Sequence, residues 1–217
     1  MTVVVVCAGG PASEIADLTA FSSEDTVFIG ADRGALHLLE NGIIPREAVG
    51  DFDSVTKNEY VRIEDAVLTV GQFQAEKDET DTELAMERAL AYRPEHIILT
   101  GVTGGRLDHM ESALQLLYRF QIKHAQILFS IRNLTNELSI LTAGEHRLQS
   151  DERFPYISFF PFGGVVEGLT LTGFKYETVE ARLEMGMTKF TSNEPLQEVC
   201  TISFHSGICL MVRSSDS

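Results

Sequence analysis

The stretch Thr26-Val-Phe-Ile-Gly-Ala-Asp-Arg-Gly-Ala35 places a short apolar segment directly before a glycine-containing turn that carries an aspartate and an arginine. Residues 34–41 then have the composition of a helix, and Gly42 is typical of the position just after a helix ends. Another apolar run, Val3 to Ala8, precedes this unit. A strand followed by a helix, repeated along the chain, predicts a parallel α/β sheet.

The same alternation continues to residue 131. The expected elements are a helix near Ser13–Ala20, a strand at Asp65–Val70, a helix at Thr80–Arg93, a strand at Ile97–Gly101, a helix at Leu107–Gln121 and a strand at Ala125–Ile131. In the helix that starts at Leu107, one third of the helical wheel is apolar and is expected to pack on the sheet. It consists of Leu107, Met110, Leu114, Leu117 and Tyr118.

Beyond residue 138 the pattern changes to short β-rich runs separated by Gly, Pro, Asn and Ser. These runs are Leu138–Thr142, Tyr156–Phe160, Val165–Leu171, Phe174–Ala181, Val199–Phe204 and Ile208–Arg213. They predict a small antiparallel sandwich or barrel. We therefore expect an α/β domain at residues 1–132, followed by an all-β domain at residues 133–217.

The composition excludes several classes of protein. The 217 residues contain 17 Lys+Arg and 32 Asp+Glu, a net charge of −15, which argues against a protein that grips nucleic acid. Residues 1–100 hold 19 of the acidic residues. The run Val3–Ala8 is too short for a membrane span or a secretory signal, so we expect a cytoplasmic protein without a membrane partner. Cys7, Cys200 and Cys209 are expected to be buried free thiols.

Ligands of parallel sheets collect at the carboxyl ends of the strands, and the loops expected there are rich in aspartate and glycine. In Gly50-Asp-Phe-Asp-Ser54, an extended backbone would point Asp51 and Asp53 the same way, so that they share one hard cation, with Phe52 in the core. A hydrogen-bonded aspartate turn exposed to solvent is the alternative interpretation.

Two helix starts are also candidate sites. Lys77-Asp-Glu-Thr-Asp-Thr-Glu83 contains four acids around Thr80, which fits either a strongly capped helix or a metal site. Thr103-Gly-Gly-Arg-Leu-Asp-His109 puts two glycines and Arg106 before a helix, as phosphate sites do. The alternative is a glycine turn in which Arg106 pairs with Asp108, with His109 on the helix face. No P-loop, dinucleotide fingerprint, serine-hydrolase elbow or His-Glu-x-x-His motif is present.

Taken in order, five motifs resemble those of bacterial thiamine pyrophosphokinases. They are Ala31-Asp-Arg-Gly-Ala35, Gly50-Asp-Phe-Asp-Ser54, Lys77-Asp-x-Thr-Asp-x-Glu83, Gly104-Gly-Arg-x-Asp-His109 and Ser192-Asn-Glu194. Together they extend over nearly the whole chain. The resemblance implies a Rossmann-like nucleotide domain followed by a β-sandwich domain, which agrees with the division expected from the sequence pattern.

The resemblance also implies an activity and a set of site residues. ATP would give its pyrophosphoryl group to thiamine, forming thiamine diphosphate and AMP, with Mg²⁺ required. Catalysis would depend on Asp51, Asp53, Asp78, Asp81 and Arg106, and the same four aspartates would hold the metal. Beside the nucleotide would lie Asp32, Thr80, Arg106, Asp108 and His109. Ser192 and Asn193 would hold thiamine, and a homodimer is implied.

Some points stay open from the sequence. The chain has no tryptophan, so Phe190 or Tyr176 would have to supply an aromatic face to thiamine. The identity of the aspartate that accepts the alcohol proton and the number of Mg²⁺ ions are not given. A pyrophosphokinase acting on a pterin alcohol, and a non-catalytic nucleotide or thiamine sensor, are the alternative functions.

Overall fold

The structure is a computed structural model that describes residues 2–21, 23–72 and 80–216. It consists of two compact units, Met1–Leu134 and Thr135–Ser217. The boundary expected from the sequence, between residues 132 and 133, falls two residues before this division. Among the described residues, none of the helices has both the length and the apolar character needed to cross a membrane.

The first unit is built on a parallel sheet. Its strands are β1 (Val3–Cys7), β2 (Thr26–Ala31), β3 (Glu47–Gly50), β4 (Thr69–Gln72), β5 (His96–Thr100) and β6 (Leu128–Arg132). They lie in the order β6-β5-β1-β2-β3-β4, and neighbouring strands are paired in parallel. The chain moves outward from β1 to β4 and then returns to the other side of β1. The carboxyl ends of β1 and β5 therefore flank the switch point at which such sheets bind ligands.

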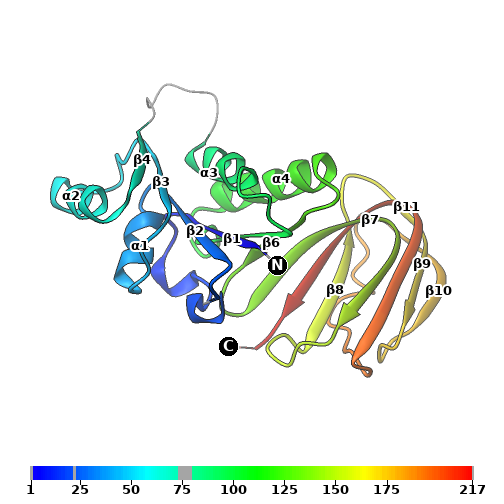
Figure 1. Cartoon of the computed structure of the whole chain (residues 1–217). Helices are drawn as coiled ribbons and strands as arrows, with labels where there is room; N and C mark the ends of the chain where they lie inside the picture. The colour runs from blue at the N-terminus through cyan, green and yellow to red at the C-terminus, as the bar shows by residue number, and fades with distance from the viewer. Residues whose placement is uncertain (1, 22, 73–79, 217) are drawn as a thin grey trace. The chain divides into compact units, whose positions relative to one another are not determined.

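Helices cover both faces of this sheet. They are α1 (Gly34–Glu40), α2 (Lys57–Ala66), α3 (Asp81–Leu90) and α4 (Leu107–Lys123), with the 3₁₀ turns η1 (Ala12–Glu14) and η2 (Leu18–Phe21). Figure 1 shows α3 and α4 on one face and α1 on the other. The inner strands carry apolar side chains on both sides, as in β1, where four of five residues are buried.

Two elements expected from the sequence are wrong. The helix near Ser13–Ala20 is replaced by η1 and η2, because the Asp17 carboxylate accepts the Thr19 N–H and the Thr100 hydroxyl accepts the Ala16 N–H. The strand at Asp65–Val70 is instead the end of α2 and the start of β4. The capping box of α2, in which Thr56 and Glu59 bond each other's backbone N–H groups, is the sequence signal that would have revealed this helix.

The buried face of α4 also differs from the expected one. Leu107 is 80% exposed, whereas the buried residues are Ala113, Leu116, Leu117, Phe120 and Gln121. Only Leu117 belongs to both sets. The helical wheel predicted the buried face from apolar residues alone. Gln121 is polar, but its amide can be buried because it bonds the backbone of Ile127 and Phe129.

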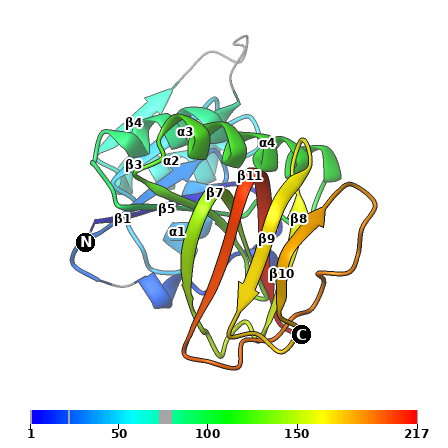
Figure 2. The same ribbon diagram turned by 90° about the vertical axis from the view of Figure 1, so that its right-hand side faces the viewer.

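The second unit is antiparallel. Its strands are β7 (Asn136–Gln149), β8 (Tyr156–Pro161), β9 (Val166–Thr172), β10 (Thr178–Leu183) and β11 (Val199–Ser214). Figure 2 shows the long strands β7 and β11 side by side, and β11 also pairs with β9 through its first half and with β8 through its second. The two strands expected at residues 199–213 are thus one strand, with a register shift between Phe204 and Ile208.

The second unit has its own core. Aromatic, aliphatic and cysteine side chains from all five strands and their loops pack together, including Phe159, Leu169, Ile202 and Cys209. Cys7, Cys200 and Cys209 are buried free thiols, as expected. Burial raises the pKa of both Cys7 and Cys209 to about 12, so these thiols are not nucleophiles at neutral pH.

Candidate functional site

A pocket with a volume of about 430 Å³ lies at the carboxyl ends of the parallel strands in the first unit. Loops after β1, β2, β3 and β5 form it together with the first turns of α3 and α4. Its lining residues include Gly9, Gly10, Asp32, Ser54, Thr80, Asp81, Gly101, Arg106 and His109. This is the edge at which ligands are expected from the strand order.

Two glycines allow the loops after β1 and β5 to meet at the pocket wall. The Gly10 N–H donates a 2.8 Å hydrogen bond to the Gly101 carbonyl. A Cβ atom on Gly10 would lie 2.4 Å from that carbonyl oxygen, and Gly101 has a φ of +73°. Larger residues at these positions would push the loops apart or strain the backbone. His37, buried in α1, holds the same loop because its Nε2 lies 3.0 Å from the Gly10 carbonyl oxygen.

Asp32 follows β2 and is fixed by its surroundings. Its backbone is left-handed, with a φ of 51°, and its N–H donates to the Val49 carbonyl at 2.7 Å. The Ser54 hydroxyl donates to Oδ2 at 2.5 Å, whereas Oδ1 is buried and has no hydrogen-bond partner among the described residues. Burial raises the pKa of Asp32, the hydrogen bond from Ser54 offsets part of this rise, and the charges of Asp81 and Asp53 add to it.

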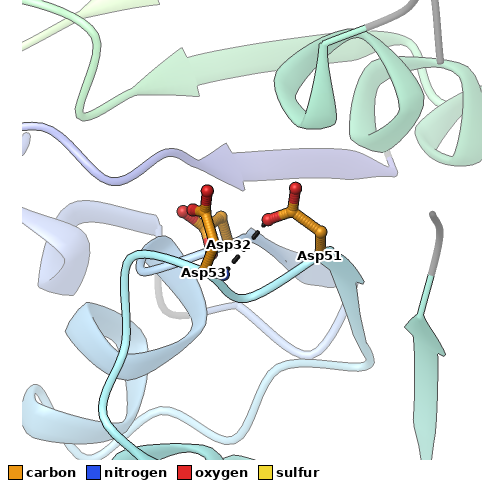
Figure 3. A group of neighbouring side chains, drawn as sticks. All are labelled: Asp32, Asp51 and Asp53. Atoms are coloured by element: carbon orange, nitrogen blue, oxygen red, sulfur yellow. Dashed lines mark hydrogen bonds between the residues drawn. The ribbon is translucent and has the colours of Figure 1, made fainter. Parts of the chain in front are cut away.

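Asp51 and Asp53 meet Asp32 at this edge (Figure 3). One carboxylate oxygen from each of the three residues lies within 4.8 Å of the others. The expected extended backbone at residues 51–53 is wrong, because Phe52 has a φ of 59°. Its ring is nevertheless buried, as expected, and the Asp53 N–H donates to Asp51 Oδ1 at 3.1 Å. The aspartate turn and the carboxylate cluster are therefore both present.

The start of α3 adds groups to the pocket. The Thr80 hydroxyl caps the helix by accepting the Glu83 N–H at 3.2 Å, and Thr80, Asp81 and Thr82 line the pocket. The Glu83 carboxylate pairs with Arg119 instead of facing a ligand. Asp78, the remaining acid expected to hold a metal, lies outside the described residues.

The start of α4 brings Gly105, Arg106 and His109 to the pocket. Among the described residues, the N-cap Arg106 makes no side-chain capping hydrogen bond to this 17-residue helix, so its first turn can offer N–H groups to an anion. Arg106 donates through Nε and Nη2 to the two carboxylate oxygens of Asp108. This pair holds the pKa of Asp108 at about 2. The interpretation of Arg106 as Asp108's partner is thus correct, and Arg106 also lines the pocket.

Sequence reasoning assigned no role to Arg33 or Ser54, although both belong to motifs that it singled out. Arg33 donates to the Ser54 carbonyl at 3.1 Å and to Glu59 at 3.3 Å, which ties the loop after β2 to the loop after β3. A short polar residue beside two aspartates is a weak signal. The contact between Arg33 and Ser54 becomes evident only once β2 and β3 are known to be neighbouring strands.

The residues expected to hold thiamine lie in the second unit. Asn193 is only 3% exposed, and its amide is used by the backbone: Oδ1 accepts from Tyr176 and Glu194, and Nδ2 donates to the Tyr176 carbonyl. Ser192 is exposed and left-handed, with a φ of 54°. Phe190 belongs to the core, whereas Tyr176 is 60% exposed.

Comparisons with known proteins agree on one family. The family models described as "Thiamin pyrophosphokinase, catalytic domain" and "Thiamin pyrophosphokinase, vitamin B1 binding domain" match residues 18–129 and 145–209. The thiamine pyrophosphokinase of Bacillus subtilis is 43% identical over 216 residues and is covered completely, as is this chain.

Solved structures give the same result. A crystal structure of the Bacillus subtilis thiamine pyrophosphokinase superposes with a TM-score of 0.92, covering 100% of both chains at 43% identity. That of the Geobacillus thermodenitrificans thiamin pyrophosphokinase has a TM-score of 0.89 at 39% identity, covering 100% of this chain and 99% of the other. The Candida albicans enzyme, at 16% identity and a TM-score of 0.84, shares the fold.

Proposed function

This chain belongs to the thiamine pyrophosphokinase family, and from that membership we propose how its residues divide the work of the reaction. It transfers the pyrophosphoryl group of ATP to thiamine, giving thiamine diphosphate and AMP. Matches to both family models exclude the pterin-alcohol enzyme, and the full-length similarity to a thiamine pyrophosphokinase argues against a sensor.

The observation that carries the proposal is the meeting of Asp32, Asp51 and Asp53 beside the pocket. Three anionic oxygens so close together repel one another, and the buried Oδ1 of Asp32 has no described partner. A hard divalent cation satisfies both conditions, and Mg²⁺ prefers carboxylate oxygens. We assign Mg²⁺ to this cluster, with Asp81 and Asp78 from the segment at the start of α3 as further ligands.

Asp32, Asp51 and Asp53 would hold Mg²⁺, whose positive charge would neutralise that of the triphosphate. The chain's own groups then orient the triphosphate. Arg106 offers a planar fork to phosphate oxygens, with Asp108 holding it in place and His109 beside it. Thr80 and the uncapped N-terminus of α4 would add to the anion site. Because AMP leaves, the site must hold all three phosphates while the thiamine hydroxyl attacks the β-phosphorus.

Deprotonation of the thiamine hydroxyl needs a nearby base. A carboxylate oxygen of the cluster that is not bound to the metal would accept this proton. At Asp32, Oδ2 is engaged by Ser54, so Oδ1 is the oxygen that would face the metal.

The two units would hold different substrates. We interpret the parallel unit as a Rossmann-like ATP-binding catalytic domain and the antiparallel unit as a β-sandwich that binds thiamine through Ser192, with Asn193 shaping the loop. We propose a homodimer from the family membership alone. Three free cysteines fit a reducing compartment such as the cytoplasm.

Incubation with ATP, thiamine and Mg²⁺, followed by separation of the nucleotides, tests the assignment. We expect AMP and thiamine diphosphate in equal amounts, little AMP without thiamine, and loss of both products when EDTA removes the metal. Formation of ADP with thiamine monophosphate would contradict the reaction, and full activity in EDTA would contradict the metal site. Sedimentation velocity of the same preparation tests the dimer.

A further inference from the structure

We propose that Ser54 is a positioning residue for the reaction: its hydroxyl holds Oδ2 of Asp32 so that Oδ1 stays turned toward the metal site. The inference rests on the proposed function, because it assumes that the cluster of Asp32, Asp51 and Asp53 takes a divalent cation. It adds a residue that is neither a ligand of that cation nor a contact of the reacting atoms.

A short hydrogen bond joins Ser54 to Asp32. The Ser54 Oγ lies 2.5 Å from Asp32 Oδ2, and the two residues come from loops after different strands. A hydrogen bond from a neutral hydroxyl to a carboxylate is charge-assisted and therefore stronger than a neutral one. The other oxygen, Oδ1, is buried without a described partner. Ser54 thus selects which oxygen of Asp32 is engaged and which is left for a ligand.

The hydrogen bond from Ser54 also opposes the repulsion between Asp32 and the neighbouring carboxylates. The charges of Asp53 and Asp81 act on Asp32, and in the absence of a restraint they favour rotation of its carboxylate away from the cluster. The backbone of Asp32 is held in the left-handed region, so the side-chain torsions are the freedom that remains. The hydroxyl of Ser54 restricts them before a cation arrives.

Ser54 is itself held in place by Arg33. Arg33, the residue after Asp32, donates from Nη1 to the Ser54 carbonyl and from Nη2 to Glu59. Glu59 in turn accepts the Thr56 N–H at 2.7 Å in the capping box of α2. Asp32 therefore bonds the hydroxyl of Ser54, and the next residue, Arg33, bonds its carbonyl. These two contacts fix the distance between the loop after β2 and the loop after β3.

Binding of Mn²⁺, which replaces Mg²⁺ at oxygen sites and is visible by electron paramagnetic resonance, tests the role of Ser54 without relying on turnover. Loss of the hydroxyl in Ser54→Ala is expected to weaken Mn²⁺ binding about tenfold, as expected for a hydrogen bond to a charged group. Ser54→Thr keeps the hydroxyl, and the exposed position leaves room for its methyl group, so binding within about threefold of the parent is expected.

Two controls make the outcomes distinct. Ser150→Ala removes an exposed hydroxyl in the second unit and should bind Mn²⁺ like the parent. Asp51→Asn removes a proposed ligand. If Asp51→Asn loses binding while Ser54→Ala binds normally, or if Ser54→Thr is as weak as Ser54→Ala, the positioning role is wrong and the metal site stands. If Asp51→Asn and Ser54→Ala both bind normally, the metal site itself is wrong.

Discussion

The guanidinium of Arg106 and the carboxylate of Asp108 face each other at the first turn of α4 and share two hydrogen bonds. Both side chains are well exposed, so this pair adds little to stability. It lies at a pocket that also contains the uncapped start of α4. We therefore propose that Asp108 holds the planar guanidinium of Arg106 in an orientation suited to phosphate.

Arg106→Lys should be strongly impaired although the charge is retained, because one ammonium cannot match the fork. We expect kcat/KM for ATP to fall at least about tenfold, mainly through a higher KM, with the KM for thiamine unchanged. Steady-state kinetics with each substrate varied measures both. Arg153→Lys is the matched control. In the second unit, Arg153 also donates through Nε and Nη2 to the two carboxylate oxygens of an aspartate two positions away, Asp151. Equal effects in both variants would contradict a specific role for Arg106.

Asp51→Asn and Asp53→Asn should each lower kcat at least about 100-fold, equivalent to roughly 2.7 kcal/mol of transition-state stabilisation, because each removes an anionic metal ligand. Folding should be unaffected or slightly improved. Asparagine at position 51 keeps the Oδ1 acceptor for the Asp53 N–H, and the repulsion within the cluster is reduced. Turnover at limiting Mg²⁺ and thermal unfolding check the two parts. Near-normal turnover in both variants would show that this segment is a hydrogen-bonded aspartate turn and not a metal site.

The contrast between Asp51 and Ser54 indicates how much the sequence could predict. Asp51 was predictable because carboxylates near the end of a parallel strand form a local pattern, and alternation of strands and helices along residues 1–131 predicts which edge they share. Ser54 was not, because its partner Asp32 is 22 residues away and the contact depends on the adjacency of β2 and β3. Pairing order across a sheet is a tertiary property.

The errors in the predicted elements have a similar origin. Thr100 accepts the N–H of Ala16 from 84 residues away, and this contact competes with a local helix that the sequence favours. The two strands expected around residues 199–213 form one strand, β11. It pairs with β7 on both sides of an irregularity at residues 204–208. Local signals locate such breaks but do not say whether a partner strand spans them.

His96 should make stability depend on pH. It is the first residue of β5, its Nε2 lies 2.8 Å from the Ser130 hydroxyl, and burial, followed by the charge of Arg132, lowers its pKa to about 4. An unfolded histidine titrates near pH 6.5, so between about pH 6.5 and 4 the unfolded state binds more protons and the free energy of unfolding falls as the pH falls. Complete titration would cost up to about 3 kcal/mol.

Urea unfolding at pH 7.5, 6, 5 and 4 measures this dependence. In His96→Gln, the part of the fall in unfolding free energy that His96 causes between about pH 6.5 and 4 should be absent. The variant should therefore gain stability relative to the parent as the pH falls. His205→Gln, which removes an exposed histidine, should leave the loss in place. Parallel curves for the parent and His96→Gln would show that His96 is not responsible.

Substitutions of Asn193 and Ser192 should have different effects, because we expect Asn193 to support the fold and Ser192 to face the ligand. Asn193→Ala breaks three hydrogen bonds to the backbone of Tyr176 and Glu194, and the partners of a buried amide are then left unsatisfied. We expect this change to lower the free energy of unfolding by about 2–4 kcal/mol. Ser192→Ala removes an exposed hydroxyl from a left-handed residue and should change stability by less than about 0.5 kcal/mol.

Calorimetric titration then decides whether this loop meets thiamine. Ser192→Ala should weaken thiamine binding several-fold and leave a non-hydrolysable ATP analogue with Mg²⁺ bound as in the parent, because the nucleotide is assigned to the pocket of the other unit. Asn193→Ala should also weaken thiamine binding, through displacement of the loop that carries the exposed Tyr176 ring. Asn193→Asp, which keeps the Oδ1 acceptor and loses the donor, should fall between Asn193→Ala and the parent in both stability and thiamine affinity. Unchanged thiamine affinity in Ser192→Ala would remove that hydroxyl from the pocket, and equal loss of both ligands would mean that the variant disturbs the fold.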